Sequence, residues 1–178
     1  MPGGGGTGGS DPGRLFCCTT SAMDEARLVA VFRALERHGV RYVVFGAIAL
    51  NLHGLVRATE DIDIFVAPHA QNIDALKAAL RSVFDDPSIE EITAEDLLGD
   101  YPAVQYVPPD GAFHIDILTR LGEAYSFDAL EQQRVPFAGM HVPVVTPRML
   151  YRMKSETVRT KDRADAEMLR RRFGSEVE

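Results

Sequence analysis

The chain has 178 residues and a formal net charge of −7, with 46% hydrophobic and 25% charged residues. This length favours one domain, and the acidic balance argues against a nonspecific nucleic-acid coat. No apolar run approaches the roughly 18 residues that a membrane-spanning helix needs, and the N-terminus lacks the basic and apolar segments of a secretory signal. The only cysteines, Cys17 and Cys18, are adjacent and indicate neither a disulfide framework nor a metal site. We therefore expect a cytoplasmic protein without a membrane partner.

The N-terminal segment differs in composition from the rest of the chain. Residues 1–20 are rich in Gly and Pro and cannot bury enough apolar surface to offset their ordering entropy, so we expect a disordered leader. Residues 21–178 are then expected to form a single domain. Its first helix should start near Ser21–Asp24 and end at His38-Gly39, because four apolar residues recur at helical spacing: Leu28, Val31, Phe32 and Leu35.

Strand and helix signals alternate along the next part of the chain. Residues 41–45 are an apolar run that ends at a glycine and predict a buried strand, followed by a short helix over 47–52. A second strand is predicted over 62–66. A helix over 71–84 follows it, because apolar residues recur there on one helical face.

The second half of the domain predicts a hairpin, two edge strands and terminal helices. Residues 90–100 are acidic and favour a loop with a helical turn. Strands over 104–107 and 113–118 flank the turn signal Pro108-Pro109-Asp110-Gly111.

Residues 135–137 and 142–145 are expected to be edge strands, where proline is tolerated. Thr146-Pro147 then opens a helical region from about residue 147. Together these elements predict an α/β (α+β) fold, with a small mixed β-sheet flanked by helices and with C-terminal helices.

Charge is unevenly distributed. Residues 148–172 contain nine Lys or Arg and four Asp or Glu, a local balance of +5, so the rest of the chain carries −12. This basic region either faces a ligand phosphate across a cleft or is a solvated helix face with local ion pairs, such as Asp162 with neighbouring arginines.

The strongest chemical signal is the segment Asp61-Ile62-Asp63-Ile64. Two aspartates at i and i+2 on a strand direct their carboxylates to the same side, and hard divalent cations such as Mg²⁺ prefer oxygen ligands of this kind. A third carboxylate, Asp116, lies in another apolar run. If its strand pairs beside the second, three like charges converge and require a cation.

Gly46 and Ala47 lie where a strand is expected to turn into a helix. Glycine permits a sharp turn and a close backbone approach to a phosphate, and the following helix N-terminus supplies free N–H groups. An ordinary strand-to-helix glycine is the alternative, but the position before Asp61 and Asp63 favours a phosphate site.

These residues resemble the nucleotidyltransferase superfamily (polymerase-beta-like), whose pattern is a hydrophobic residue, Gly-Gly/Ser, a short helix, Asp-h-Asp and a later h-Asp-h, where h is hydrophobic. The run from Gly46 through Arg57 and Thr59 to Asp63 is similar to small bacterial nucleotidyltransferases related to the AbiEii toxin. The segments Leu150–Lys154 and Arg159–Asp165 are similar to that family as well. Ala47 departs from the usual Gly or Ser, which removes a hydroxyl contact and preserves a small volume.

The resemblance implies roles for particular residues. Asp61, Asp63 and Asp116 would be the catalytic and metal-binding carboxylates, holding Mg²⁺ or Mn²⁺, with Asp116 as the general base. Gly46, Ala47, Lys154 and Lys161 would bind the nucleotide. Arg57 is open between a phosphate contact and an ion pair with Glu60.

The implied reaction transfers NMP from an NTP to an acceptor hydroxyl on RNA, protein or a small molecule. The toxin relatives imply an antitoxin protein as a further partner. Two alternatives stay open: a noncatalytic nucleotide-binding or interaction module on the same fold, and a kinase-like use of the phosphate site.

Overall fold

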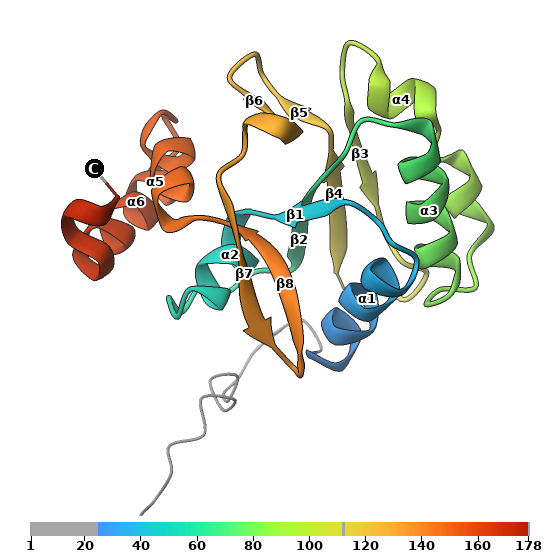
Figure 1. The fold of residues 1–178 in the computed structure, drawn as a ribbon, viewed down its shortest axis with the longest axis horizontal. Coiled ribbons are helices and arrows are strands. Elements are labelled where there is room, and N and C mark those ends of the chain that lie inside the picture. The colour runs from blue at the N-terminus through green and yellow to red at the C-terminus, as the bar shows by residue number, and fades with distance from the viewer. Residues whose placement is uncertain (1–24, 112, 178) are drawn as a thin grey trace, which may run out of the picture.

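The computed structural model describes residues 25–111 and 113–177, which form a mixed sheet surrounded by helices (Figure 1). The helices are α1 (Glu25–Arg37), α2 (Gly46–Leu52), α3 (Ala70–Arg81), α4 (Ala94–Leu98), α5 (Pro147–Ser155) and α6 (Thr160–Phe173). The strands are β1 (Tyr42–Val44), β2 (Asp61–Val66), β3 (Ala103–Tyr106), β4 (His114–Leu118), β5 (Arg120–Leu121), β6 (Tyr125–Ser126), β7 (Gln132–Phe137) and β8 (Met140–Val145). The predicted fold class is confirmed.

The main sheet has six strands in the order β3-β4-β2-β1-β8-β7. The β2–β4 and β1–β8 pairs are parallel, and the other three pairs are antiparallel. The predicted hairpin is β3–β4. Apolar residues of the central strands are fully buried, as Ile62 and Ile64 illustrate, because they alternate with outward-facing neighbours along β2.

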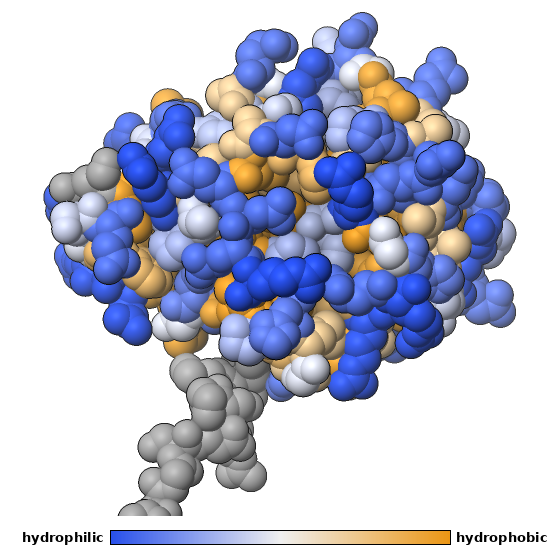
Figure 2. Space-filling view, viewed as in Figure 1, coloured by the Kyte–Doolittle hydropathy of each residue, from blue (hydrophilic) through white to orange (hydrophobic). Residues whose placement is uncertain are grey.

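The helices occupy different parts of the periphery. The first and third helices pack against each other, whereas α5 and α6 form a pair on the opposite side of the sheet in Figure 1. The face shown in Figure 2 is covered largely by hydrophilic side chains, with hydrophobic ones visible toward its centre. No helix in the described part of the chain is long and apolar enough to cross a membrane.

The N-terminal predictions fall outside the described residues. These are the leader over 1–20, the two cysteines and the helix start at Ser21–Asp24. The described part of α1 begins at Glu25, and Leu28, Val31, Phe32 and Leu35 form its buried face as predicted.

The third helix is shorter than predicted, because it ends at Arg81 instead of Phe84. The chain turns tightly at 82–84, where the N–H groups of Val83 and Phe84 both donate to Leu80 O. This turn directs Phe84 into the core, where its ring lies 5.6 Å from Tyr106 and 6.1 Å from Phe113. Phe84 therefore continues the helical spacing of apolar residues, but it lies in the loop after α3 and places its side chain in the core.

The edge-strand prediction is right for β7 and wrong for β8, which lies between β1 and β7. The β1–β8 pairing consists of Val44 opposite Val144 alone. A short ladder of this kind loses little when Pro143 cannot donate a hydrogen bond, so a proline is tolerated inside the sheet.

The helical turn predicted within residues 90–100 is confirmed, whereas a second hairpin was not foreseen. The acidic segment after α3 holds α4, which begins with a capping box: Thr93 accepts from the Asp96 N–H, and the Asp96 side chain accepts from Thr93. Residues 120–126 form a second, two-stranded hairpin, β5–β6. As predicted, α5 opens at Thr146-Pro147, where the Thr146 hydroxyl accepts from the Met149 N–H.

Candidate active site

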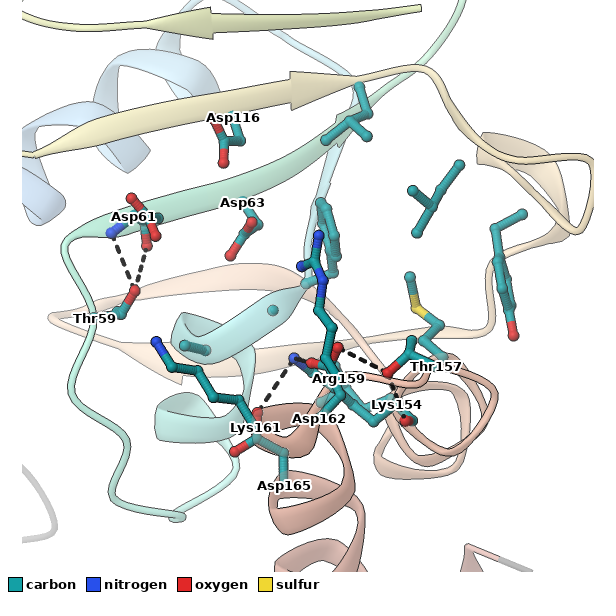
Figure 3. Close-up of a pocket in the computed structure, with 18 of the residues that line it drawn as sticks. Thr59, Asp61, Asp63, Asp116, Lys154, Thr157, Arg159, Lys161, Asp162 and Asp165 are labelled. Atoms are coloured by element: carbon teal, nitrogen blue, oxygen red, sulfur yellow. Dashed lines mark hydrogen bonds and ion pairs between the residues drawn. The ribbon is translucent and has the colours of Figure 1, made fainter.

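The three predicted carboxylates come together on adjacent parallel strands. The register pairs Asp63 of β2 with Asp116 of β4, and Asp61 with His114. Because side chains two residues apart share a face, all three carboxylates lie on the same side of the sheet. They line one pocket of about 1140 Å³, which opens between the sheet, the β5–β6 hairpin and the α5–α6 pair (Figure 3).

Gly46 makes this arrangement sterically possible. Its φ of +66° lies in the left-handed region, and a Cβ at this position would lie 2.0 Å from Asp63 Oδ2. The next residue, Ala47, donates its backbone N–H to the Asp63 carboxylate. The glycine is therefore required by the close approach of Asp63, a reason that the sequence did not supply.

The Asp63 carboxyl group is under electrostatic strain. Burial, followed by repulsion from Asp116 and Asp61, raises its pKa to about 7, although Lys154 and the Ala47 N–H act in the opposite direction. Burial and like charges both disfavour ionisation. A cation placed among the three carboxylates would remove this penalty.

Two neighbouring side chains orient the carboxylates and were not assigned from the sequence. Gln105 Nε2 donates to Asp116 Oδ1 at 2.9 Å, and His114 Nδ1 lies 3.2 Å from Asp61 Oδ1. Thr59 fixes the start of β2, because its hydroxyl accepts from the Asp61 N–H at 3.0 Å. Each of these partners lies directly opposite its aspartate on the neighbouring strand. The sequence could have indicated them only if the register of the strands had been known.

The donor chemistry of the pocket fits a hard divalent cation. Within residues 25–111 and 113–177, no three His, Cys, Asp or Glu side chains form a ready-made metal cluster. Magnesium commonly takes only one or two protein carboxylates and completes its shell with water and substrate phosphates. Three carboxylates with one raised pKa therefore fit a metal that binds together with a nucleotide.

Opposite the carboxylates lies a cluster of charged residues from α5, α6 and the loop after α2. Arg57 Nε lies 2.9 Å from Asp165 Oδ1, and Lys154 Nζ lies 3.2 Å from Asp165 Oδ2 and 2.6 Å from Asp162 Oδ1. Both carboxylates are buried, and Thr157 also donates to Asp162 at 2.9 Å. We call Arg57, Lys154, Asp162 and Asp165 the charge cluster.

The charge cluster bears on an alternative that the sequence left open, in which Asp162 forms local ion pairs. Asp162 pairs with Lys154 of the preceding helix and not with neighbouring arginines of its own helix. Burial works to raise the pKa of Asp162, but hydrogen bonds from Lys154 and Thr157 outweigh it and lower the pKa. For Arg57, the partner in the structure is Asp165, which neither proposed alternative had named.

Asn51 holds the loop that carries Arg57. Its Oδ1 accepts from the Arg57 N–H at 2.7 Å, and its Nδ2 donates to Arg57 O at 2.8 Å. His53 is the C-cap residue of α2, and its Nε2 lies 2.8 Å from Val145 O. Lys161, the remaining predicted nucleotide-binding residue, lines the same pocket.

The mixed sheet flanked by helices has the nucleotidyltransferase fold, as its likeness to solved structures shows. The structure is similar to the lincosamide antibiotic adenylyltransferase LnuA with bound lincomycin, at 16% identity and a TM-score of 0.55, covering 84% of this chain and 98% of that one. It is also similar to ANT(2'')-Ia in complex with adenylyl-2''-tobramycin, at 14% identity and a TM-score of 0.54, over 85% and 90% of the two chains. An antigenic nucleotidyltransferase-like protein from Paracoccidioides brasiliensis gives 18% identity and a TM-score of 0.51, over 83% and 76%.

The sequence also identifies the family. Residues 29–171 match the nucleotidyl transferase AbiEii toxin family of type IV toxin–antitoxin systems, and the chain belongs to this family. No curated protein matches the sequence significantly. The protein is therefore an enzyme of the nucleotidyltransferase class.

Proposed function

We propose that the protein is an Mg²⁺-dependent nucleotidyltransferase that moves NMP from an NTP to an acceptor hydroxyl. The single observation that supports it most strongly is the pocket in which Asp61, Asp63 and Asp116 converge. Three carboxylates so close together, one with its pKa raised to about 7, are destabilising unless a cation joins them.

In this proposal Asp61 and Asp63 hold the metal, and Asp116 accepts the proton of the attacking hydroxyl. The hydroxyl oxygen forms a bond to the α-phosphorus, the bond from that phosphorus to the bridging oxygen breaks, and pyrophosphate leaves. Bound Mg²⁺, or Mn²⁺ in its place, supplies positive charge that offsets the charge developing on the phosphates. Gln105 keeps the Asp116 carboxylate oriented toward the acceptor through its 2.9 Å hydrogen bond.

The phosphates of the NTP would lie between the Gly46-Ala47 turn and the basic side of the pocket. Arg57, Lys154 and Lys161 line that side. Ala47 has no hydroxyl to offer, so this turn would contact phosphate through its small volume and backbone only.

The acceptor and the partner are proposed from the comparisons. LnuA and ANT(2'')-Ia were solved with an antibiotic and with an adenylylated antibiotic, which makes small polyhydroxyl molecules one acceptor class to test beside RNA and protein. Membership in a type IV toxin–antitoxin family supports a toxin role with an antitoxin protein as partner. We place the reaction in the cytoplasm, where NTPs are available.

The test is a transfer assay with each of the four α-³²P-labelled NTPs, Mg²⁺ and a panel of total RNA, lysate protein and antibiotics. We expect label in one acceptor class, dependent on Mg²⁺ and absent with Asp63→Asn. Control reactions contain EDTA. Binding of an NTP without transfer to any acceptor would contradict the proposal and favour a noncatalytic nucleotide-binding module.

A further inference from the structure

The pocket is more acidic than a triphosphate site should be. Its lining contains four Lys or Arg and eight Asp or Glu. All four cations come from one side, the Arg57 loop and the α5–α6 region: Arg57, Lys154, Arg159 and Lys161. How these four charges are used therefore decides what can bind a polyanion.

Two of the four cations are already neutralised by protein carboxylates. Arg57 and Lys154 contact Asp162 and Asp165, whose side chains are only 10% and 4% exposed. Two positive and two negative charges within ion-pair distance leave the charge cluster without net charge. A triphosphate that took either cation would leave a buried carboxylate without its partner, which is strongly unfavourable.

Arg159 and Lys161 are different. Neither forms an ion pair with any residue in the described part of the chain, and both are exposed. In Figure 3 Arg159 extends from the α5–α6 loop into the pocket on the side of Asp63, and Lys161 points toward the corner of Thr59 and Asp61. Asp162, the carboxylate whose pKa Arg159 lowers, is already bonded to Lys154 and Thr157.

The backbone explains how Arg159 reaches the pocket. It is the N-cap residue of α6, with extended angles of φ −70° and ψ 128°, and its side chain takes no part in capping. The side chain therefore leaves the helix at its first turn and faces the carboxylates. Its planar guanidinium can bind two phosphate oxygens at once, whereas Lys161 acts as a point charge.

We propose that Arg159 and Lys161 are the residues that bind the NTP triphosphate directly, and that Arg57 and Lys154 serve to hold α5, α6 and the Arg57 loop together. This inference rests on the proposed function and adds Arg159 to it. It also separates two residues that the sequence assigned to the nucleotide, because Lys161 keeps that role and Lys154 does not. The cations that are paired with protein carboxylates stabilise the structure, and the two unpaired cations bind the ligand.

The experiment measures dissociation constants for the four α,β-methylene NTPs and the corresponding NMPs in Mg²⁺, for wild type, Arg159→Ala, Arg159→Lys and Lys161→Ala. The matched control is Arg163→Ala, because Arg163 is an exposed cation one turn further along α6 that does not line the pocket. Melting temperatures check that each variant is folded.

We expect Arg159→Ala and Lys161→Ala to bind the preferred triphosphate analogue about tenfold to a hundredfold more weakly, since contacts between charged groups are the strong ones. NMP affinity should change much less, Arg159→Lys should recover part of the loss, and Arg163→Ala should match wild type. Wild-type affinity in Arg159→Ala, or equal losses for NMP and triphosphate, would overturn the inference. If wild type itself bound no analogue, the proposed function would fail first.

Discussion

The two sides of the pocket use charge in opposite ways. On the sheet, Asp61, Asp63 and Asp116 place like charges together, and the pKa of Asp63 rises to about 7 as a result of burial and repulsion. On the helical side, Asp162 and Asp165 are buried with cations at ion-pair distance. The carboxylates of the sheet therefore need a ligand from outside, whereas the charge cluster is satisfied by the protein itself. Removing a charge should have opposite effects on the two sides.

The largest effect is expected for Asp63→Asn. Loss of a residue that hydrogen-bonds to a metal ligand commonly lowers metal affinity or activity by about 10–100-fold. Loss of a ligand itself should therefore lower the rate of NMP transfer by more than about a hundredfold. The metal-free variant should melt no lower than wild type, because one of three repelling charges is gone while the Ala47 N–H keeps an acceptor. Transfer rates and melting curves measure both, and an unchanged rate would remove Asp63 from the metal site.

The stability of the metal-free protein should depend on pH because of the same repulsion and burial at Asp63. Asp63 has a pKa of about 7 in the fold and an ordinary value of 3.8, so the folded state retains a proton that the unfolded state has lost between these values. Stability should therefore fall as pH rises through this window, by at most about 4 kcal/mol, since each pKa unit corresponds to about 1.4 kcal/mol.

Urea unfolding at pH 5 and pH 8 with EDTA measures the part of this fall above pH 5, which is at most about 3 kcal/mol. Asp63→Asn should flatten the profile, and Mg²⁺ should restore stability at pH 8. A profile that is equally steep in the variant would assign the pH dependence to other groups.

On the helical side, loss of a charge should destabilise. Asp165→Asn leaves Arg57 and Lys154 without a shared carboxylate, which should cost about 3 kcal/mol, the lower end for a broken buried pair because both cations reach the pocket. The matched control is Glu167→Gln on the same helix. It pairs with Arg170 and Arg171 at the surface and should leave the melting temperature near that of wild type. Equal melting temperatures for the two variants would contradict the structural role of Asp165.

Substitutions at Gly46 and Gly39 distinguish the cost of backbone strain from the cost of a steric clash. Both have nearly the same φ, +66° and +65°, but a Cβ at 39 meets nothing within 4 Å, whereas one at 46 meets Asp63. Gly39→Ala should cost about 1–2 kcal/mol of strain. Gly46→Ala should cost about 1–2 kcal/mol more than that, because the contact forces Asp63 or the turn to move. It should also lose most NMP transfer, which Gly39→Ala should keep.

The smallest effect is expected for Gln105→Leu. It removes one exposed hydrogen bond to Asp116, so the rate of transfer should fall about fivefold, or about 1 kcal/mol, with little change in KM for the NTP. Gln133→Leu, at an exposed position of β7 outside the pocket, is the control. A change in KM alone would place Gln105 in nucleotide binding instead.

Much of the fold was predictable because its signals are local. Alternating polarity set β2, the proline and glycine turn signalled the β3–β4 hairpin, and Thr146-Pro147 opened α5. The failures were places where tertiary packing took precedence over local pattern. Phe84 continues the helical spacing but enters the core from a turn, and Pro143 lies inside the sheet because the β1–β8 ladder is so short.

A further local signal came from the last helix. Asp162, Asp165, Ala166 and Leu169 share its buried face at helical spacing, and carboxylates at such positions require buried partners. The pattern therefore indicates a charge cluster. It did not name the partners, because Arg57 lies 108 residues before Asp165.

The sequence by itself determined that Asp61 and Asp63 face one way, because side-chain direction on a strand follows from a period of two. It also determined a basic C-terminal region. Only the tertiary structure decided that β4 pairs in parallel with β2 and brings Asp116 beside Asp63. It alone decided which cations are neutralised and which remain available, because long-range pairing depends on how α5 and α6 pack against the Arg57 loop, and no local pattern encodes that geometry.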